Sequence, residues 1–565
     1  MEYLVFGLAI AAFVLVLFVT EAVRARKEEK EFVADLYHHY DRLNQKKYTL
    51  DRFGKMGSYF RKHEEEGQLD DITWNDLGMD ELFKRMNYCL SASGEEYLYH
   101  TLRTPKQEAG ELDHLEEVIG FFGEHPDIRV HVQYAINKLG YMGKFSLYDY
   151  LDNLDVLGER SSRKNIFMDL LFLPFIGMLW VNFSLGILGI VVLVVANIIS
   201  YFKEKGEIDP YISSFSYIMR LMRTCGELEK ASVPPCAREW EELRRAGGML
   251  QGMRRNSFWV MSPLRGNASG DILAIFFDYI RMVFHVDLIK FNSMLRLLRG
   301  HIGDVDNLIG VVGYVETAIS IWEFRKSLEA GEGGTGWCVP EFTSRAQIEI
   351  REGYHPLLTA PVKNSIHADR GVLLTGSNAS GKSTFLKMTA LNAILAQTIH
   401  TCAAEGYRGS FFRIYSSMAL RDDMVSGESY YIVEIKALKR ILDAAARGGP
   451  VLCFVDEVLR GTNTVERIAA STQILKSLSG FGILCFAATH DIELTELLKG
   501  SFANYHFEED VREGDVYFNY KLKSGKAATR NAIKLLGLMG YDHSIIQKAS
   551  AQAEHFTETG VWELA

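Results

Sequence analysis

The sequence has little that points to disulfide or zinc chemistry. Its seven cysteines are scattered through 565 residues, with no CxxC pair and no spacing typical of a zinc site. Several lie in apolar runs such as LCFVDE and LCFAATH, where a thiol is most often a small core residue. We therefore expect all seven cysteines to be reduced and structural, as is usual on the cytosolic side of a membrane.

Positive charge is also scarce. The chain has 62 Lys and Arg against 72 Asp and Glu, a formal net charge of −10. Binding to phosphate backbones depends on clustered Lys and Arg, so this balance argues against broad nucleic-acid binding, although a local basic face can still exist. Candidates for such a face within 206–345 are Arg220, Arg223, Arg244, Arg245, Arg254 and Arg255. Glu239, Glu241 and Glu242 are interleaved with them, which is more typical of a solvated helix face.

Long apolar runs, in contrast, are present in two places. Residues 3–19 are apolar throughout, close to the lower limit of about 17 residues for a membrane span. A cleavable signal peptide begins with positive charge and ends in small residues, whereas this run follows Met-Glu and precedes Arg24, Arg26 and Lys27. We therefore predict a transmembrane anchor over 1–20 rather than a signal peptide, followed by a charged juxtamembrane helix over 21–68.

The second apolar run, residues 166–202, is longer than one crossing needs, and Asp169 is its only charged residue before the flanking lysines. The sequence VNFS at 181–184 lies at its middle, which favours two spans folded back as a hairpin within 161–205. A re-entrant hairpin and a buried soluble hairpin are the alternatives. Basic residues flank both runs, so the positive-inside rule places the N-terminus outside and 21–164 and 203–565 in the cytoplasm. The prediction is an integral protein with three spans, in a bacterial plasma membrane.

A phosphate-binding motif follows a short apolar strand at 372–375. The motif GSNASGKST satisfies G-x-x-x-x-G-K-[ST], in which backbone N–H groups and a helix N-terminus surround the phosphates. We expect Lys382 to reach the β- and γ-phosphates of ATP and Ser383 to ligate Mg²⁺. The loop residues predicted to bind the nucleotide are Gly376, Ser377, Asn378, Ala379, Ser380, Gly381, Lys382, Ser383 and Thr384.

About seventy residues later, the apolar strand VLCFVDE ends in two acids. This is typical of a Walker B strand, in which Asp456 would hold Mg²⁺ and Glu457 would polarise the attacking water. A buried strand that merely ends at solvent-facing acids is the simpler alternative. A third apolar strand ends at His490, which we expect to sense the γ-phosphate. The predicted catalytic residues are therefore Glu457, His490 and Lys382, and the predicted metal-binding residues are Ser383 and Asp456.

Between these motifs lies MALRDDMVSGESYYIVEIKALKRIL, which resembles the signature region of the MutS (DNA mismatch repair) family. Three more blocks occur in the family's order: REGYHPLL at 351–358, DEVLRGTNT at 456–464 and FAATHDIEL at 486–494. The resemblance covers about 346–540 and implies an α/β P-loop ATPase domain that works as a homodimer. It also implies that Ser426, Gly427 and Ser429 face the partner's ATP, that 460–464 lie at the dimer seam, and that Ile366 contacts adenine.

Weaker similarity to the helical core of that family extends over 72–105 and 273–329. It implies an all-α core and lever in two parts, 69–160 and 206–345, interrupted by the hairpin, with the ATPase domain at 346–540 and a helical tail at 541–565. The chain departs from the members that recognise mismatches, which carry a large N-terminal domain with a Phe-x-Glu motif. Residues 21–71 are too few for that domain. Phe122-Gly-Glu124 matches the motif but lies inside the helical core, so we interpret the match as coincidence. Thr529-Arg530-Asn531 also replaces the family's Ser-Tyr/His-Gly.

Three functions fit these observations, and all require ATP and Mg²⁺. The favoured hypothesis is a dimeric, nucleotide-driven switch in the membrane that acts on an unknown protein partner. A membrane-tethered clamp on branched or mismatched DNA is the alternative, although the chain lacks the mismatch reader and any evident basic tract. A transport ATPase is third, because three spans are few for a substrate path.

Overall fold

The computed structural model describes residues 20, 23–41, 46–142, 146–253, 260, 279–330, 336–377, 380–418, 430–460, 462–512, 515–526, 533, 536 and 540–562. The chain forms two compact units. The first comprises Met1–His63, Asn87–His100 and Glu117–Glu323, and the second comprises Glu64–Met86, Thr101–Glu116 and Phe324–Ala565. The domain boundaries predicted from the sequence were continuous ranges. The structure instead assigns two short upstream segments, Glu64–Met86 and Thr101–Glu116, to the C-terminal unit.

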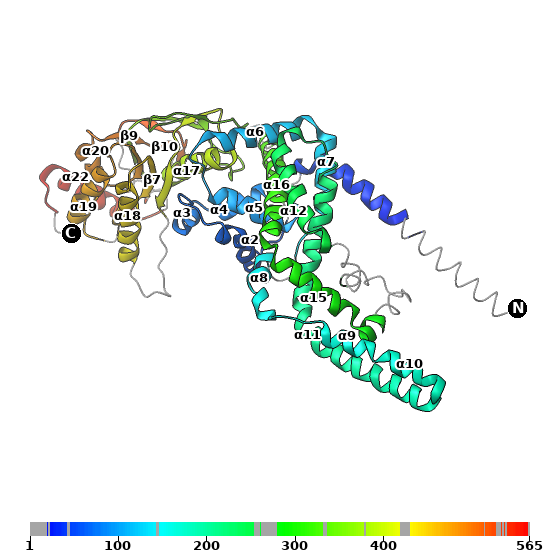
Figure 1. The fold of residues 1–565 in the computed structure, drawn as a ribbon. Coiled ribbons are helices and arrows are strands. Elements are labelled where there is room, and N and C mark those ends of the chain that lie inside the picture. Colours follow the sequence, from blue (N-terminus) through cyan, green and yellow to red (C-terminus); the bar gives the residue numbers. More distant parts are fainter. Residues whose placement is uncertain are drawn as a thin grey trace. The chain divides into compact units, whose positions relative to one another are not determined.

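The first unit is helical (Figure 1). Its helices are residues 23–36, η1 (His39–Asp41), α2 (Leu50–Lys62), α5 (Ala92–Arg103), α6 (Ala109–Glu124), α7 (Pro126–Asn137), α8 (Leu147–Asp152), η2 (Leu154–Leu157), α9 (Arg163–Leu170), α10 (Phe172–Val181), α11 (Phe183–Leu228), η3 (Pro234–Cys236), α12 (Ala237–Met249), α15 (Val286–Arg299) and α16 (Ile302–Ala330). Helices α5, α6 and α16 contribute residues to both units. The predicted juxtamembrane helix over 21–68 is two helices, residues 23–36 and α2, rather than one.

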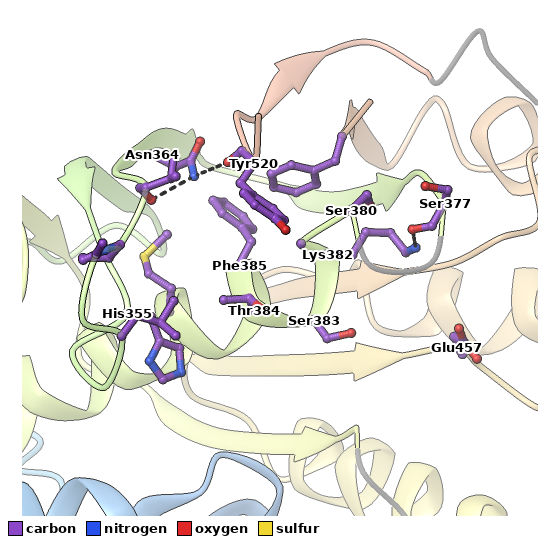
Figure 2. A pocket seen from close by; sticks show the side chains of 17 residues that line it. His355, Asn364, Ser377, Ser380, Lys382, Ser383, Thr384, Phe385, Glu457 and Tyr520 are labelled. Atoms are coloured by element: carbon purple, nitrogen blue, oxygen red, sulfur yellow. Dashed lines mark hydrogen bonds between the residues drawn. The ribbon is translucent and has the colours of Figure 1, made fainter. Parts of the chain in front are cut away.

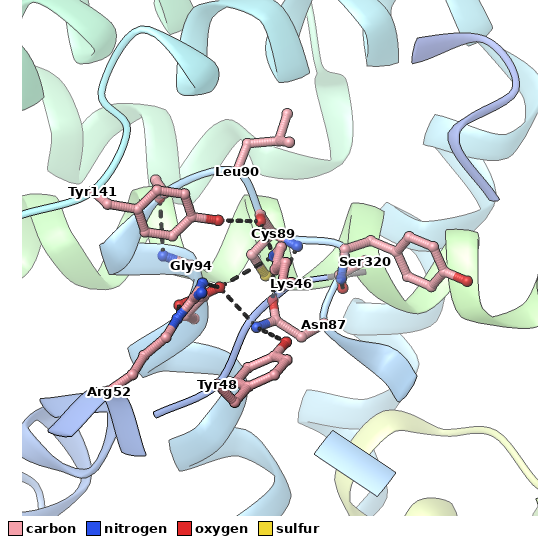
Figure 3. A network of polar contacts seen from close by, with 12 residues as sticks. Lys46, Tyr48, Arg52, Asn87, Cys89, Leu90, Gly94, Tyr141 and Ser320 are labelled. Carbon is pink, nitrogen blue, oxygen red and sulfur yellow. Dashed lines mark hydrogen bonds and ion pairs between the residues drawn. The ribbon is translucent and has the colours of Figure 1, made fainter. Parts of the chain in front are cut away.

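A polar network lies among the helices of this unit (Figure 3). The carboxylate of Glu95 on α5 accepts hydrogen bonds from Arg52 at 2.6 Å, Asn87 at 2.8 Å and Lys46 at 3.1 Å. The Glu95 side chain is only 3% exposed, so burial of its charge depends on these partners. The network thereby fastens the segment 46–52 to the core.

A second buried carboxylate joins α16 to the start of α5. Glu316 on α16 accepts hydrogen bonds from the backbone N–H of Ser91 at 3.1 Å and from its hydroxyl at 2.5 Å. A Cβ added to Gly94 would come within 1.9 Å of the Glu316 carboxylate. Glycine at position 94 is therefore required for this close approach of the two helices.

Helix α10 and the first half of α11 lie side by side as a hairpin (Figure 1). The turn is at Asn182, whose side chain accepts the N–H of Leu185 at 3.2 Å and so caps α11, within the predicted turn at 181–184. The predicted end of the hairpin at 205 is not a helix end, because α11 continues to Leu228. The hydropathy changes at 203 but the helix does not end there, and it continues even through Gly206 and Pro210.

The hairpin presents apolar side chains outward. Trp180 is 84% exposed, Val181 is 83% exposed and Phe183 is 66% exposed. The helical stretches Arg163–Val181 and Phe183–Leu228 are long and apolar enough to cross a membrane. The described residues of the first unit leave these side chains exposed, which does not fit a hairpin buried among them. The predicted N-terminal span lies outside the described residues.

The second unit is built on a six-stranded sheet with the order β12-β9-β4-β8-β7-β6. Its strands are β4 (Gly371–Thr375), β6 (Arg413–Ser417), β7 (Val451–Asp456), β8 (Ile483–Ala488), β9 (Phe502–His506) and β12 (Lys523–Ser524). All neighbouring pairs are parallel except β12 with β9. Strands β4, β7 and β8 are almost fully buried, which explains why they appear in the sequence as continuous apolar runs.

Helix α17 (Lys382–Ile399) packs against β7 and β8 and also against β2 of a second sheet, and almost all its residues are buried. This sheet has the order β1-β5-β2-β3, with β1 (Glu341–Phe342), β2 (Ile348–Gly353), β3 (Asn364–Ala368) and β5 (Gly406–Gly409). A separate core cluster is formed by residues of the six-stranded sheet with α18 (Tyr430–Ala446), α19 (Thr464–Ser477) and α20 (Glu493–Leu497). The unit also has α3 (Asp71–Asp76), α4 (Met79–Met86), a hairpin of β10 (Glu509–Arg512) with β11 (Asp515–Phe518), and α22 (His543–Thr559).

The short upstream helix α3 docks on the edge strand β6. Asp76 accepts a hydrogen bond from the Ser416 hydroxyl at 2.7 Å and another from the N–H of Met418 at 2.8 Å. These bonds explain why residues 64–86 belong to the C-terminal unit. The predicted order of helical part followed by α/β domain is confirmed.

Candidate active site

The phosphate-binding motif joins the central strand β4 to helix α17. Gly376 and Gly381 have φ values of 146° and 108°, which side chains with a Cβ rarely adopt. Lys382 is the first residue of α17, and its Nζ donates hydrogen bonds to the carbonyls of Gly376 and Ser377, both at 2.8 Å. The ammonium group is thereby held over the loop, at the N-terminus of a buried helix, where a phosphate would bind.

Two further observations concern the close packing of this loop and its fit to a phosphate ligand. A Cβ on Gly376 would come within 2.7 Å of the carbonyl oxygen of Phe507, so the backbone must approach closely there. The hydroxyl oxygen of Ser380 is buried and has no hydrogen-bond partner within the described part of the chain. Buried polar atoms are normally paired, so an oxygen-rich ligand would satisfy Ser380.

The predicted metal ligands lie together. The Ser383 hydroxyl donates a hydrogen bond of 2.5 Å to Oδ2 of Asp456, which ends β7. Burial raises the pKa of Asp456, against the opposing effects of the Ser383 hydrogen bond and the Lys382 charge. A hydroxyl and a carboxylate form an oxygen donor set that suits Mg²⁺, which when bound would neutralise charge on the β- and γ-phosphates.

The two predicted catalytic residues beyond the loop are in contact. Nε2 of His490 lies 2.9 Å from Oε1 of Glu457, and Nη1 of Arg460 lies 2.9 Å from Oε2. Glu457 has a left-handed φ of 55°, which is costly for a residue with a Cβ and is typical of functional sites. Its backbone N–H donates to the carbonyl of Ala488 at 3.0 Å, which ties the turn after β7 to the end of β8. The carboxylate is therefore held on both sides.

Glu434 on α18 is a positioning residue that the sequence analysis missed. Its carboxylate accepts the backbone N–H of Leu459, which itself has a left-handed φ of 57°. Burial raises the pKa of Glu434, and the N–H groups of Leu459 and Arg460 oppose that effect. Glu434 lies within the quoted signature block, but no spacing rule links it to the turn after β7.

A cavity of about 570 Å³ extends from the phosphate loop toward β3 (Figure 2). Its lining includes Lys382, Ser383 and Glu457 at one end and His355 and Asn364 at the other, and Tyr520 lies beside Gly381 of the phosphate loop. This volume is in the range of small-molecule sites, roughly 300–1,000 Å³. Burial, with the nearby Lys387, lowers the pKa of His355 to about 4, so this imidazole is neutral at physiological pH.

The contribution of Tyr520 to the cavity was not foreseen from the sequence. Asn364 donates to the carbonyl of Tyr520 at 2.9 Å and accepts the N–H of Leu522 at 2.8 Å, which places the Tyr520 ring at the cavity. Ile366, the predicted adenine contact, is not among the lining residues. Its side chain is buried in β3, on the face it shares with Asn364 and Ala368. Since Asn364 on the same face lines the cavity, the adenine contact of Ile366 stays a prediction.

The remaining predicted residues divide into two groups. Gly376, Ser377, Ser380, Gly381, Lys382, Ser383, Thr384, Asp456, Glu457 and His490 lie around the phosphate end of the cavity. Asn378, Ala379, Ser426, Gly427 and Ser429 lie outside the described residues, as does the segment 529–531.

Comparison with known proteins agrees with this geometry. Residues 372–557 match the family model for MutS domain V. The C-terminal part of the chain is a MutS domain V. MutS domain V is an ATPase domain, so the chain carries an ATPase, as predicted, and the family uses ATP and Mg²⁺.

Curated relatives are DNA mismatch repair proteins named MutS. The protein from Nitratidesulfovibrio vulgaris is 34% identical over 243 residues, which are 40% of this chain and 26% of the relative. The protein from Thermus thermophilus is 33% identical over 221 residues, 38% of this chain and 27% of the relative. The protein from Leptospira interrogans is 29% identical over 288 residues, 48% of this chain and 32% of the relative. The matches thus span about a quarter to a third of the relatives' length.

Proposed function

We propose that this chain is an ATP-hydrolysing switch that is anchored in a membrane and works as a dimer through its MutS domain V. The observation that carries the proposal is one cavity whose phosphate end is lined by Lys382, Ser383 and Glu457, with Asp456 and His490 in contact with them. The segments that follow the parallel strands β4, β7 and β8 meet there, which brings together groups for the phosphates, for Mg²⁺ and for the attacking water.

The side chains divide the chemistry among them. The loop N–H groups and Lys382 bind the phosphates of ATP, and Ser383 and Asp456 would hold Mg²⁺. Glu457 orients the attacking water and accepts its proton, while His490 and Arg460 keep the carboxylate in place. Because His490 and Arg460 already hold the Glu457 carboxylate, this side chain needs little reorganisation during hydrolysis.

Dimerisation would convert hydrolysis into a switch. Members of the MutS family pair through their ATPase domains, and we expect Ser426, Gly427 and Ser429 to face the partner's nucleotide. ATP would then bind the paired arrangement more tightly than the separated one, and this differential affinity is what shifts the population. The protein on which the switch acts is a partner still to be identified.

The hairpin of α10 and α11 supports the membrane anchor. Its outer surface is apolar, and α11 has 20 residues from Phe183 to Phe202 before the first charged side chain. At about 1.5 Å per residue, this length spans roughly 30 Å of hydrocarbon. Arg163 and Lys164 precede the hairpin and Lys203 and Lys205 follow it, which favours a cytoplasmic location for the ATPase. A second anchor over 1–20 with its N-terminus outside completes the proposal.

ATP turnover by the full chain in detergent tests the hydrolytic site. We expect Glu457→Gln to lower kcat by about 100-fold or more, because general-base catalysis contributes typically 10²–10⁴. Glu496→Gln is the matched control, since Glu496 is an exposed carboxylate of the same domain that pairs with Lys526. Equal turnover by wild type and Glu457→Gln would contradict the assignment.

The names of the relatives favour a second candidate, a membrane-tethered clamp on DNA. Against it, the exposed surface of α12 mixes Arg238, Arg244 and Arg245 with Glu241. The same assay with duplex and branched DNA separates the two candidates. Stimulation by DNA that is lost in Glu457→Gln would favour the clamp, whereas turnover indifferent to DNA would favour the switch.

A further inference from the structure

Two cysteines of the second unit face each other across an isolated antiparallel bridge. The N–H of Cys338 donates to the carbonyl of Cys402 at 3.0 Å, and the N–H of Cys402 donates to the carbonyl of Cys338 at 2.9 Å. Residues that exchange both bonds in this way have Cα atoms about 5.5 Å apart. Disulfides have Cα separations of about 4.4–6.8 Å, so the backbone already has the spacing that a disulfide needs.

The two thiols have different environments. Cys338 is partly exposed, whereas Cys402 is fully buried. A hydrogen bond from Cys402 lowers the pKa of the Cys338 thiol, and the nearby Arg351 guanidinium and a backbone N–H add to this effect. Burial raises the pKa of Cys402. Cys338 therefore has the features of an attacking thiol and Cys402 those of a resolving thiol.

The segments that carry the cysteines are held in register by Tyr354. Its hydroxyl donates to the carbonyl of Gly336 at 2.6 Å, and its backbone N–H donates to the carbonyl of Ala403 at 3.0 Å. Tyr354 is itself buried. Because one buried residue binds both segments, the position of Cys338 relative to Cys402 is fixed on both sides.

We propose that Cys338 and Cys402 form an oxidation site that hydrogen peroxide or an organic hydroperoxide converts into a disulfide. The Cys338 thiolate attacks the peroxide, which forms a sulfenic acid and releases water or an alcohol. The sulfur of Cys402 then attacks that of Cys338, the S–S bond forms, and water leaves. The two thiols lose two electrons and two protons, and the peroxide is reduced. A small-molecule thiol restores the reduced pair by thiol–disulfide exchange.

A second cysteine pair in the same unit provides an internal comparison. Cys453 on β7 and Cys485 on β8 are direct neighbours in the parallel sheet. Both are fully buried within the core cluster of the domain. Neither of these thiols is exposed, whereas Cys338 is partly exposed, so oxidation should discriminate between the two pairs.

The disulfide would fasten the chain at a structural junction. Cys338 lies between α16 and β1, and Cys402 lies three residues beyond Ile399, the last residue of the phosphate-binding helix α17. Close by, Arg325 of α16 donates to the Thr401 hydroxyl at 2.9 Å and to the carbonyl of His400 at 3.0 Å. The covalent link would close a loop that contains the whole phosphate-binding motif, and it would restrict the unfolded chain.

Oxidation of the full chain in detergent with hydrogen peroxide tests the proposal, followed by alkylation of free thiols and peptide mass spectrometry. We expect a cross-linked peptide that joins 338 to 402, a mass lower by two hydrogens, and a higher Tm that dithiothreitol reverses. Cys338→Ser should abolish the cross-link and the Tm shift, and Cys402→Ala should do the same. Cys453→Ser should leave both unchanged.

Two outcomes would overturn the proposal, and neither requires that a variant folds. One is wild-type protein in which Cys338 reaches the sulfinic acid while Cys402 remains a free thiol. The other is a cross-link between 453 and 485 that forms as fast as the one between 338 and 402. The proposal does not depend on the membrane or DNA assignments.

Discussion

Nε2 of His490 lies 2.9 Å from Oε1 of Glu457, although the two residues belong to separate strand–turn segments. The contact follows from the sheet, because β7 and β8 are parallel neighbours in which Asp456 pairs with Ala488. The residues that follow β7 and β8 therefore lie side by side at the carboxyl-terminal edge of the sheet. Asp491 is held by Arg467 through bonds of 2.7 and 2.9 Å, which fixes the turn that carries His490.

Replacing His490 should impair hydrolysis more than binding. We expect His490→Ala to lower kcat by about 10- to 100-fold while the Kd for ATP changes little, because the imidazole contacts Glu457, the residue expected to activate the water. Steady-state kinetics with a fluorescent-nucleotide binding assay would separate the two effects. His543→Ala, in an exposed position at the start of α22, is the control. An unchanged kcat in His490→Ala would exclude the role.

The phosphate loop should not tolerate a side chain at position 381. Gly381 has a φ of 108°, and a Cβ there would lie 3.2 Å from the ring of Tyr520. Strain of about 1–3 kcal/mol is expected for such a backbone, so Gly381→Ala should weaken ATP binding by roughly tenfold or more. Gly500→Ala is the control, because Gly500 has open space around it. Equal affinities measured by calorimetry would contradict this account.

The phosphate end of the site could be predicted because its signals are local. The residues from Gly376 to Ser383 are contiguous, and an apolar strand that ends in acids indicates where parallel strands deliver side chains. The position of Tyr520 could not be predicted in this way. Tyr520 reaches the cavity through bonds to Asn364, which is 156 residues away, and nothing in the local pattern indicates that pairing.

The fold shows the same division between local and distant information. Hydropathy located the hairpin and its turn at Asn182, because apolar runs and polar breaks are local features. The docking of α3 on β6 depends on hydrogen bonds between Asp76 and Ser416, residues 340 positions apart. The period of two in β3 decides the direction of the Ile366 side chain, and the sequence alone did not indicate which face of that strand is covered.

Close contact within the hairpin should depend on its glycines. A Cβ on Gly189 would come within 2.1 Å of the Phe175 ring, whereas nothing lies within 4 Å of a Cβ on Gly177. We therefore expect Gly189→Leu to separate α10 from α11 and to lower the Tm in detergent, and Gly177→Leu to have little effect. Differential scanning fluorimetry of both variants checks this. Equal Tm values for the two would show that the helices do not pack as described.

Burial of Glu96 should make stability fall as the pH rises. Burial raises the pKa of Glu96 to about 8, against a hydrogen bond from Ser146, and the charges of Asp149 and Glu95 raise it further. The stabilisation is complete below the unfolded pKa of about 4.5 and is lost as the pH rises through about 8. Glu96→Gln cannot ionise, so its Tm should exceed that of wild type at pH 9 and change less between pH 5 and pH 9.

The exposed Glu117→Gln of the same unit is the control for that experiment, and it should follow the wild-type curve. If Glu96→Gln and wild type have parallel Tm profiles over this range, Glu96 is ionised in the folded protein and the burial argument fails.

Glu116 should show the opposite dependence on pH. Burial would raise its pKa, but two hydrogen bonds from Arg325, at 2.6 and 2.7 Å, and another from His400 hold the pKa at about 2. A depressed pKa stabilises the fold above the unfolded value of about 4.5, and this contribution is lost as the pH falls toward 2. Glu116→Gln should therefore lower the Tm at pH 7, where it leaves the Arg325 guanidinium, only 3% exposed, without its carboxylate.

The difference in Tm between wild type and Glu116→Gln should shrink steadily as the pH falls from about 4.5 to about 2, because over this range the unfolded wild-type chain binds a proton at Glu116 that the folded protein does not. Glu111→Gln is the matched control on the same helix, since Glu111 pairs with Lys106 at the surface. A surface pair contributes little, so this variant should follow wild type at every pH. A Tm difference for Glu116→Gln that stays constant down to pH 2 would mean that its cause is lost packing and not the ion pair, because packing does not titrate.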